Sequence, residues 1–532
     1  MSDHFNPVSG IDSPYNAALR FIDRNIEKGY GEKTAIYFEN KQISYAELNK
    51  EVNQFAQALS DINVEHENRV MLLMHDSPEF IISFFGSVKI GAIPVPLNTL
   101  GTAKDYVYYL NHSRAKVLVV NDDLWENIKD FRSEFAYLRH VIVVSDHNYS
   151  YDNVIHFKDF VKGKSEYVKT FYSTVDDAAF WLYTSGSTGK PKGAIHLQKS
   201  MEHALSNFAK KVLRMTEDDV TLSASKLFFA YGLGNGMYFP LGVGASTVLM
   251  KDKPTPEKVF EAIERYKPTI FFGVPTLYGS MLDYVERSEK KYDLSSIRVC
   301  VSAGEKLPSH YFKKWKEKFS INILDGIGST EVLHIYLSNT LENFKPGSTG
   351  KVVPGYEAKI VNEKFEPVES NEVGDLLIKG DSITAGYWSN SVQNKMKLNG
   401  EWLHTGDKYY KDEDGYYWYV GRSDDMLNVG GILVSPIEIE SALIDHTDVL
   451  EVAVQGNENE KGLEKPKAYV VLKEGVVGNS DKEAELIQYV RGKLAKHKYP
   501  REITFMESLP KTTTGKIQRF KLKQSLTDTN NV

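Results

Sequence analysis

Short apolar runs rich in β-branched residues alternate with amphipathic stretches through the first two-thirds of the chain, and this alternation constrains the fold most. The apolar runs stand at 70–74, 92–96, 116–120, 141–144, 247–250 and 269–272, and the amphipathic stretches stand at 78–89, 125–131 and 257–266. Strands that alternate with helices predict βαβ units and largely parallel sheets.

The pattern changes after about residue 345, where glycines and prolines interrupt short alternating runs and predict an antiparallel β subdomain. A fresh αβ pattern follows residues 421–425. We therefore predict an α/β fold with an N-terminal domain over 1–421 and a smaller α+β C-terminal domain over 422–532, a length within the usual domain range.

Composition excludes several classes of protein. The 532 residues are 42% hydrophobic and carry a net charge of −7, which gives no general electrostatic reason to bind nucleic acid or an anionic membrane. No window approaches 18 consecutive apolar residues, so no membrane span is expected. Neither end matches a targeting signal, so the cytoplasm is the expected compartment. The single cysteine, Cys300, excludes cysteine-based metal clusters and is interpreted as a core residue.

A loop rich in glycine, hydroxyls and lysine follows the apolar run 178–182. It reads Tyr-Thr-Ser-Gly-Ser-Thr-Gly-Lys-Pro-Lys-Gly at 183–193, a composition that suits a polyphosphate. It is not the P-loop of NTPases, because only two residues separate Gly186 from Gly189 and Pro191 follows Lys190. A flexible linker is the alternative, disfavoured because the loop is short, dibasic and flanked by apolar runs.

Six further motifs stand in order along the chain. They are Asp-Gly-Ile-Gly-Ser-Thr-Glu at 325–331, Gly-Asp-Leu-Leu-Ile-Lys-Gly at 374–380, Gly-Tyr-Trp at 386–388, Trp-Leu-His-Thr-Gly-Asp at 402–407, Gly-Arg-Ser-Asp-Asp at 421–425 and Pro-Lys-Thr-Thr-Thr-Gly-Lys at 510–516. With the loop, this set resembles the adenylate-forming enzymes, which include acyl-CoA synthetases, peptide-synthetase adenylation domains and luciferases. The resemblance implies that ATP and Mg²⁺ activate a small carboxylic acid as acyl-AMP, and that the acyl group then passes to coenzyme A.

The resemblance also implies a role for individual residues. The cradle for the β- and γ-phosphates comprises Thr184, Ser185, Gly186, Ser187, Thr188, Gly189 and Lys192. The adenine pocket comprises Gly304, Glu305, Asp325 and Gly326, and the ribose is held by Asp407 and Arg422. The catalytic residues are Thr330 at the α-phosphate, Glu331 at Mg²⁺ and Lys516 at the acyl carboxylate. Taken alone, Thr330-Glu331 is a helix-start signal and Lys516 a solvated lysine.

The resemblance further implies a C-terminal domain that rotates between the two half-reactions. Asp424 matches the hinge, and Gly430 and Gly431 match the loop that faces the CoA tunnel. Many relatives carry a lysine where this chain has Asn428, so the details of the hinge differ here.

The segment Phe-Phe-Ala-Tyr-Gly-Leu-Gly-Asn-Gly at 228–236 suits neither a plain helix nor a plain strand. With 329–335 and 16–25 it resembles the benzoate–CoA ligase branch. That match implies an acyl pocket lined by Ala230, Tyr231, Gly232, Ile327, His334 and Ile335. Core packing is the alternative for the aromatic residues of this segment. Benzoate or a substituted benzoate is the first choice. A short branched-chain acid such as isobutyrate or 2-methylbutyrate stays open, because one methylene changes discrimination by only roughly 1–3 kcal/mol.

Three other functions are weighed against a CoA ligase. A stand-alone adenylation enzyme that loads a carrier protein would share every ATP motif. A non-catalytic nucleotide-binding scaffold is disfavoured because Lys516, Glu331 and the phosphate loop are all present. A luciferase-like oxygenase is disfavoured by the benzoate-ligase resemblance. A homodimer is retained as a possible assembly without a specific signal for it.

Overall fold

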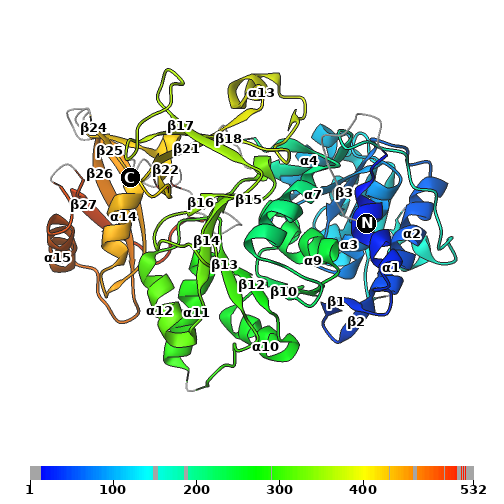
Figure 1. Cartoon of the computed structure of the whole chain (residues 1–532), viewed down its shortest axis with the longest axis horizontal. Helices are drawn as coiled ribbons and strands as arrows, with labels where there is room; N and C mark the ends of the chain where they lie inside the picture. The colour runs from blue at the N-terminus through cyan, green and yellow to red at the C-terminus, as the bar shows by residue number, and fades with distance from the viewer. Residues whose placement is uncertain are drawn as a thin grey trace.

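The computed structural model describes residues 14–147, 154–184, 190–288, 290–429, 432–458, 464–495 and 498–511, together with 517, 519 and 522. The N-terminal elements occupy one end of the molecule and the C-terminal elements, orange and red in Figure 1, occupy the other. The elements rich in antiparallel strands lie between them along one side (Figure 1).

The first sheet is parallel throughout and has the strand order β4-β3-β5-β6-β7. Its strands are β3 (Arg69–Leu73), β4 (Ile93–Pro96), β5 (Val117–Asn121), β6 (His140–Val144) and β7 (Ile155–His156). The predicted helix over 78–89 is confirmed as α3 (Pro78–Lys89), which starts with proline and is almost wholly buried. The neighbouring helices are α2 (Tyr45–Asp61), α4 (Ala103–Ser113) and α6 (Phe157–Val161).

The predicted helix over 125–131 is wrong in its bounds. The chain forms α5 (Asp122–Glu126) and then a 3₁₀ turn, η2 (Lys129–Glu134). The Asn127 side chain donates to the carbonyl of Asp123 at 3.1 Å. Such a local bond competes with continued helix, which accounts for the interruption.

The second sheet has the order β16-β15-β14-β13-β12-β10-β11-β1-β2 and is parallel from β14 to β1. Its strands are β1 (Thr34–Phe38), β2 (Lys41–Ser44), β10 (Val220–Ser223), β11 (Ser246–Leu249), β12 (Ile270–Gly273), β13 (Val299–Ser302), β14 (Ile323–Gly328), β15 (Ile335–Ser338) and β16 (Lys351–Val352). Helices α10 (Pro256–Tyr266), α11 (Pro275–Arg287) and α12 (Ser309–Phe319) connect or follow these strands (Figure 1). The predicted parallel βαβ architecture is therefore confirmed.

The antiparallel subdomain predicted after residue 345 is also confirmed. It contains β17 (Glu357–Val361), β18 (Gly374–Lys379), β20 (Leu398–Asn399), β21 (Trp402–Lys411) and β22 (Tyr417–Arg422). A smaller antiparallel sheet joins β8 (Ala178–Thr184), β9 (Lys192–Leu197) and β19 (Gly386–Tyr387). The second of these sheets brings the 386–388 motif beside the phosphate loop.

Short helices complete the N-terminal part. They are η1 (Leu19–Asp23), α1 (Arg24–Glu27), α7 (Ser200–Ala204), η3 (Leu205–Val212), α8 (Ala230–Leu233), η4 (Gly234–Tyr238), α9 (Phe239–Val243), η5 (Thr330–Val332) and α13 (Ser391–Lys397). The 3₁₀ turn η6 (Ser423–Asp425) follows at the start of the predicted C-terminal domain. The segment 228–236 ends in α8 and the π-turn of η4, so it is helical but not a plain helix. Across the described residues, every helix is too short or too polar to cross a bilayer.

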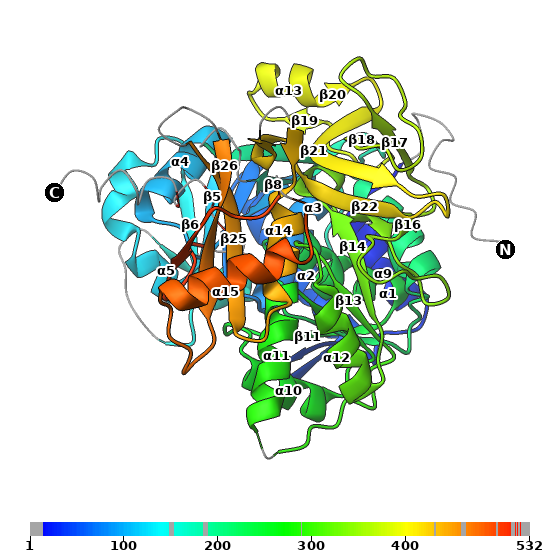
Figure 2. The same cartoon turned by 90° about the vertical axis from the view of Figure 1, so that its left-hand side faces the viewer.

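The C-terminal part builds a core of its own. The hairpin β23 (Leu427–Val429) and β24 (Ile432–Val434) precedes α14 (Pro436–Ile444), and α15 (Ser480–Arg491) packs on the sheet of β25 (Val449–Glu458), β26 (Glu464–Leu472) and β27 (Glu502–Phe505). Figure 2 shows α15 and this sheet together on one side of the molecule. A separate apolar core is what an independently moving domain requires, and the boundary at 421/422 stays a prediction.

Candidate active site

The carboxyl ends of the parallel strands β13 and β14 bring the four predicted adenine-pocket residues together. Gly304 and Glu305 follow β13, whereas Asp325 and Gly326 lie within β14. Ser302 of β13 is the register partner of Asp325. Gly304 has φ +99°, a left-handed conformation that favours glycine. Ligands of α/β proteins commonly bind at this edge of a parallel sheet.

Asp325 is a buried carboxyl, 5% exposed. Within the described part of the chain, neither of its carboxyl oxygens makes a hydrogen bond of ordinary geometry. Burial raises its pKa to about 8, and the backbone at Leu307 and the ammonium of Lys306 oppose that rise only in part. Burial therefore favours the protonated form of this acid.

Thr330 and Glu331 lie on η5, a single 3₁₀ turn rather than the start of a longer helix. The Ser329 hydroxyl caps this turn by accepting the backbone N–H of Val332 at 3.3 Å. Leu333 then takes φ +72°, a strained conformation for a branched residue. Strain of this kind persists only where the surrounding structure holds it, and it clusters at functional sites.

The Glu331 side chain and backbone are both held by the strand that carries the 386–388 motif. The Tyr387 hydroxyl donates to Glu331 Oε1 at 2.9 Å, and the backbone N–H of Thr384 donates to the Glu331 carbonyl at 2.7 Å. Among the described residues, these bonds do not engage the second carboxylate oxygen of Glu331. A carboxylate oxygen is the kind of donor that Mg²⁺ prefers.

Thr184 and Lys192 face each other where β8 and β9 flank the phosphate loop. Lys192 is buried, and its ammonium donates to Gln393 Oε1 at 2.7 Å. Burial lowers the pKa of Lys192, Glu331 opposes that shift, and the charge of Lys397 adds to it. The remaining cradle residues, Ser185, Gly186, Ser187, Thr188 and Gly189, lie outside the described residues.

Asp407 and Arg422 are register partners on β21 and β22. Arg422 Nη1 donates to Asp407 Oδ1 at 3.0 Å and to the Thr405 carbonyl at 3.3 Å. Burial disfavours the charge on Arg422, but the Asp407 carboxylate and Tyr419 outweigh it and raise the pKa of Arg422. The structure thus brings the two predicted ribose residues into direct contact.

Tyr231 and His334 bring two segments of the predicted acyl pocket together. Their rings lie 5.6 Å apart between centroids. The Tyr231 hydroxyl donates towards the carbonyls of Val301 at 3.2 Å and Gly273 at 3.3 Å, at the ends of β13 and β12. His334 Nε2 donates to Asn235 Oδ1 at 3.0 Å. Burial lowers the pKa of His334 to about 3, so this ring is neutral.

The other predicted acyl-pocket residues differ in exposure. Gly232 and Ile335 are buried, whereas Ala230 and Ile327 are partly exposed against the main core. A side chain at Gly232 would meet the Lys226 carbonyl, so the backbone there is close-packed. Ile327 and Ile335 lie on the paired strands β14 and β15. Apart from Tyr231 and His334, the residues of this wall are thus apolar or glycine.

The predicted hinge residue Asp424 lies exposed on η6, between β22 and β23. Its neighbour Ser423 donates to Asp375 Oδ1 at 3.0 Å. The predicted CoA-tunnel residues Gly430 and Gly431 and the predicted catalytic Lys516 lie outside the described residues. Lys511 and Ile517, which flank the last motif, form an antiparallel bridge.

Sequence reasoning missed three residues that hold the site together. Tyr387 belongs to the Gly-Tyr-Trp motif, but its bond to Glu331 joins residues 56 positions apart. Gln393 holds Lys192 across 201 positions, and Asn235 holds His334 across 99. The Gly-Tyr-Trp motif was a signal for Tyr387, whereas no local pattern marks Gln393.

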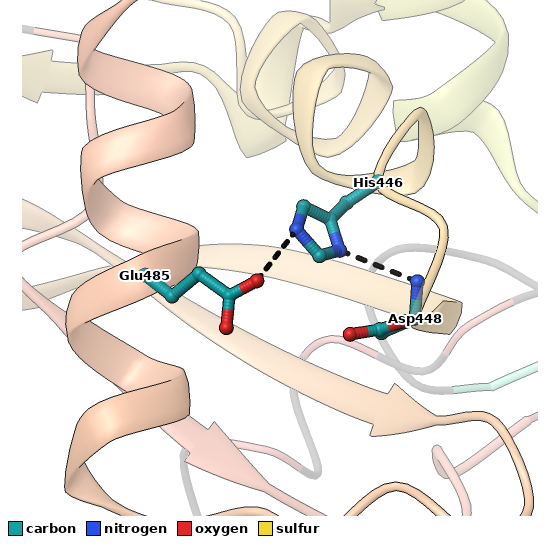
Figure 3. A group of neighbouring side chains, drawn as sticks. All are labelled: His446, Asp448 and Glu485. Carbon is teal, nitrogen blue, oxygen red and sulfur yellow. Dashed lines mark hydrogen bonds and ion pairs between the residues drawn. The ribbon is translucent and has the colours of Figure 1, made fainter.

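A second group of side chains that could ligate a metal ion lies in the C-terminal part, outside this site. His446, Asp448 and Glu485 point towards one another (Figure 3). Lys482 already donates to Asp448 at 2.7 Å and to Glu485 at 2.6 Å, and His446 Nε2 lies 3.2 Å from Glu485. An ammonium therefore fills the position of a cation, and this group is a structural ion-pair network.

The model of the AMP-binding enzyme family matches residues 22–388, and that of the AMP-binding enzyme C-terminal domain matches residues 438–516. The chain therefore belongs to the AMP-binding enzyme family. It is 44% identical over 529 residues to a benzoate–CoA ligase of Thauera aromatica, covering 99% of each chain.

Two solved structures are similar over almost their whole length. One is the anthranilate CoA ligase AuaEII in complex with anthranoyl-AMP, at 39% identity and a TM-score of 0.92, with 98% of each chain covered. The other is a benzoate CoA ligase from Burkholderia xenovorans, at 41% identity and a TM-score of 0.88, with 96% of this chain and 99% of that chain covered. The enzyme is an acid–thiol ligase of the AMP-forming class, as the sequence motifs predict.

Proposed function

We propose that this enzyme joins benzoate, or a closely related aromatic acid, to coenzyme A at the expense of ATP. The observation that carries the proposal is the 44% identity, over 99% of both chains, to a benzoate–CoA ligase. The apolar wall around Tyr231 and His334 supports it, because a neutral His334 places no charge beside an aromatic ring. A short branched-chain acid is the alternative that the test below distinguishes.

In the first half-reaction, the acid's carboxylate oxygen attacks the α-phosphorus of ATP. An acyl–phosphate bond forms, the bond to the β-phosphate breaks, and pyrophosphate leaves. Asp407 would accept the ribose hydroxyls, and Arg422 keeps its carboxylate in place. Asp325 would accept the exocyclic amine of adenine through a carboxyl oxygen that has no partner of ordinary geometry among the described residues. Thr330 would donate to the α-phosphate, and Lys516 would offset the charge that grows there.

Glu331 and Thr184 would hold Mg²⁺ together with phosphate oxygens, since their oxygen donors fit this hard cation. When bound, the ion neutralises charge on the phosphates and helps pyrophosphate to leave. Tyr387 keeps one Glu331 oxygen engaged, and this bond holds the carboxylate in place. Lys192 would turn from Gln393 to the β- and γ-phosphates when ATP enters.

In the second half-reaction, the CoA sulfur attacks the acyl carbonyl and AMP leaves. We propose that residues 422–532 rotate about Asp424 between the steps and that Gly430 and Gly431 then face the pantetheine. The described contacts across this boundary include Arg287 with Glu474 at 3.2 Å, an exposed pair. An exposed ion pair contributes only about 0–1 kcal/mol, so this pair would not oppose rotation. The Arg422–Asp407 and Ser423–Asp375 bonds stand before Asp424 and would stay in place during a rotation about it.

The test is CoA-thioester formation with ATP, Mg²⁺ and a panel of acids, followed by mass spectrometry. The panel holds benzoate, hydroxy- and aminobenzoates, acetate, isobutyrate, 2-methylbutyrate and octanoate. Benzoyl-CoA as the product with the highest kcat/KM supports the proposal. A preference for isobutyrate or 2-methylbutyrate replaces the acid while keeping the reaction. Pyrophosphate release without any thioester would indicate a carrier-loading adenylation enzyme.

We also propose that the enzyme works in the cytoplasm, where ATP and CoA are available, and that it forms a homodimer. Cell fractionation and light scattering after size-exclusion chromatography test these two points. A scattering mass equal to that of one chain would contradict the dimer.

A further inference from the structure

The short helix α13 (Ser391–Lys397), yellow in Figure 1, is bound tightly to the candidate site although no motif marks it. Asn394 accepts the backbone N–H of Tyr387 at 2.7 Å and donates to the Tyr387 carbonyl at 3.1 Å. Tyr387 in turn holds Glu331. A two-point bond of this kind fixes where the helix lies relative to β19, the strand of Tyr387.

Two residues one helical turn apart on α13 face the charged groups of the site. Gln393 accepts the ammonium of Lys192 at 2.7 Å. Lys397 follows four positions later, so both side chains lie on the same side of the helix. The Lys397 ammonium approaches Gly406, the residue directly before Asp407.

Gly406 marks the point at which two cations converge. A Cβ built on Gly406 would lie 2.9 Å from Lys397 Nζ and 3.2 Å from Arg422 Nη2. Gly406 has φ +79°, and its missing side chain is what admits both cations. Lys397 is therefore beside Arg422 at the ribose end, and its charge also acts on Lys192 at the phosphate-loop end.

The carboxylates of this region are already engaged. Asp407 is bonded to Arg422, and Glu331 to Tyr387. No carboxylate is paired with Lys397 within the described part of the chain. Burial lowers the pKa of His404, the charges of Lys397 and Lys408 add to that shift, and Asp375 opposes it. Among the described residues, Lys397, Arg422 and Lys192 thus lie near two acids that already have partners, an excess of positive charge that suits an anion.

We propose that Lys397 binds the β- and γ-phosphates of ATP and holds the leaving pyrophosphate. Its place between Arg422 and Lys192 is where a triphosphate that runs from the ribose to the phosphate loop would pass. The inference rests on the proposed function only in requiring that ATP binds at this site. It adds a phosphate ligand from a helix outside the phosphate loop.

The test compares the binding of Mg·ATP and of AMP to the full chain by calorimetry, without any acid. K397M removes the charge and keeps the length of the side chain. K395M, on the same helix and exposed, is the matched control. Because a hydrogen bond to a charged group contributes about 1.5–3 kcal/mol, K397M should weaken ATP binding by roughly 10- to 150-fold.

AMP affinity should stay unchanged in K397M, because AMP lacks the β- and γ-phosphates, and K397R should restore most of the ATP affinity. Pyrophosphate should also inhibit K397M less, by the same factor. Equal weakening of ATP and AMP would show that Lys397 only maintains the nucleotide site and would overturn the proposal, as would unchanged ATP binding. If the wild type bound no ATP, the proposed function would fall as well, whereas failure with benzoate alone leaves this inference standing.

Discussion

Replacing Gly234 by alanine tests the predicted acyl pocket beside His334. A Cβ there would lie 2.5 Å from Cδ2 and 2.8 Å from Nε2 of His334, well inside the 3.4–4 Å of ordinary contact. Gly234 has helical torsions, φ −66° and ψ −56°, so alanine suits the backbone and only the contact opposes it. His334 must move, and its 3.0 Å bond to Asn235 must lengthen or break.

Overpacking of this kind costs about 1–3 kcal/mol, which is a factor of roughly 5 to 150 in an equilibrium or rate constant. We expect G234A to lower kcat/KM for benzoate by such a factor and to lower kcat/KM for acetate by a smaller factor. The KM for ATP should stay nearly unchanged. Initial-rate measurement of thioester formation checks this. G31A is the control, because its new methyl would meet Ala46 at an ordinary 3.8 Å. A KM for ATP that rises as much as that for benzoate would refute the placement of His334 in the acyl pocket.

Three further predictions concern the nucleotide groups. D407N should raise the KM for ATP by about tenfold or more, because a charge-assisted acceptor is lost at the ribose, with little effect on the KM for benzoate in initial-rate kinetics. K516A should slow acyl-AMP formation by roughly 10²- to 10³-fold while sparing thioester formation from supplied benzoyl-AMP, which single-turnover assays of each half-reaction separate. The pKa of Asp325 is raised to about 8 in the folded chain, so the folded state holds a proton that the unfolded state releases, and stability falls as pH rises from about 4 to 8. D325N should remove this dependence. The difference between the melting temperatures of D325N and the wild type should therefore shift in favour of D325N from pH 5 to pH 8, and an equal difference at both pH values would contradict the assignment.

Much of the fold follows from local sequence pattern. The helix over 78–89 was predicted at its observed bounds because Pro78 starts it and its apolar spacing is regular. The α5–η2 break was not predictable, because it depends on how Asn127 bonds to Asp123 once the chain has turned.

The sequence motifs predict which residues form the candidate site, but they do not predict which of these residues are in contact. The pairing of Asp407 with Arg422 depends on the register of β21 and β22. Gln393 and Lys397 look like solvated helix residues in the sequence, and only the docking of α13 on Tyr387 turns them towards Lys192 and Arg422. Long-range register and docking set these contacts, and neither leaves a short-range pattern.

The central claim is that the acid passes through an acyl-adenylate. The most direct measurement uses benzoate labelled with ¹⁸O in both carboxylate oxygens, with ATP, Mg²⁺ and CoA, and mass analysis of every product. Attack of the carboxylate on the α-phosphorus predicts one ¹⁸O atom in AMP, one in benzoyl-CoA and none in pyrophosphate. Label in inorganic phosphate with ADP as the co-product, or AMP without label, would contradict the account.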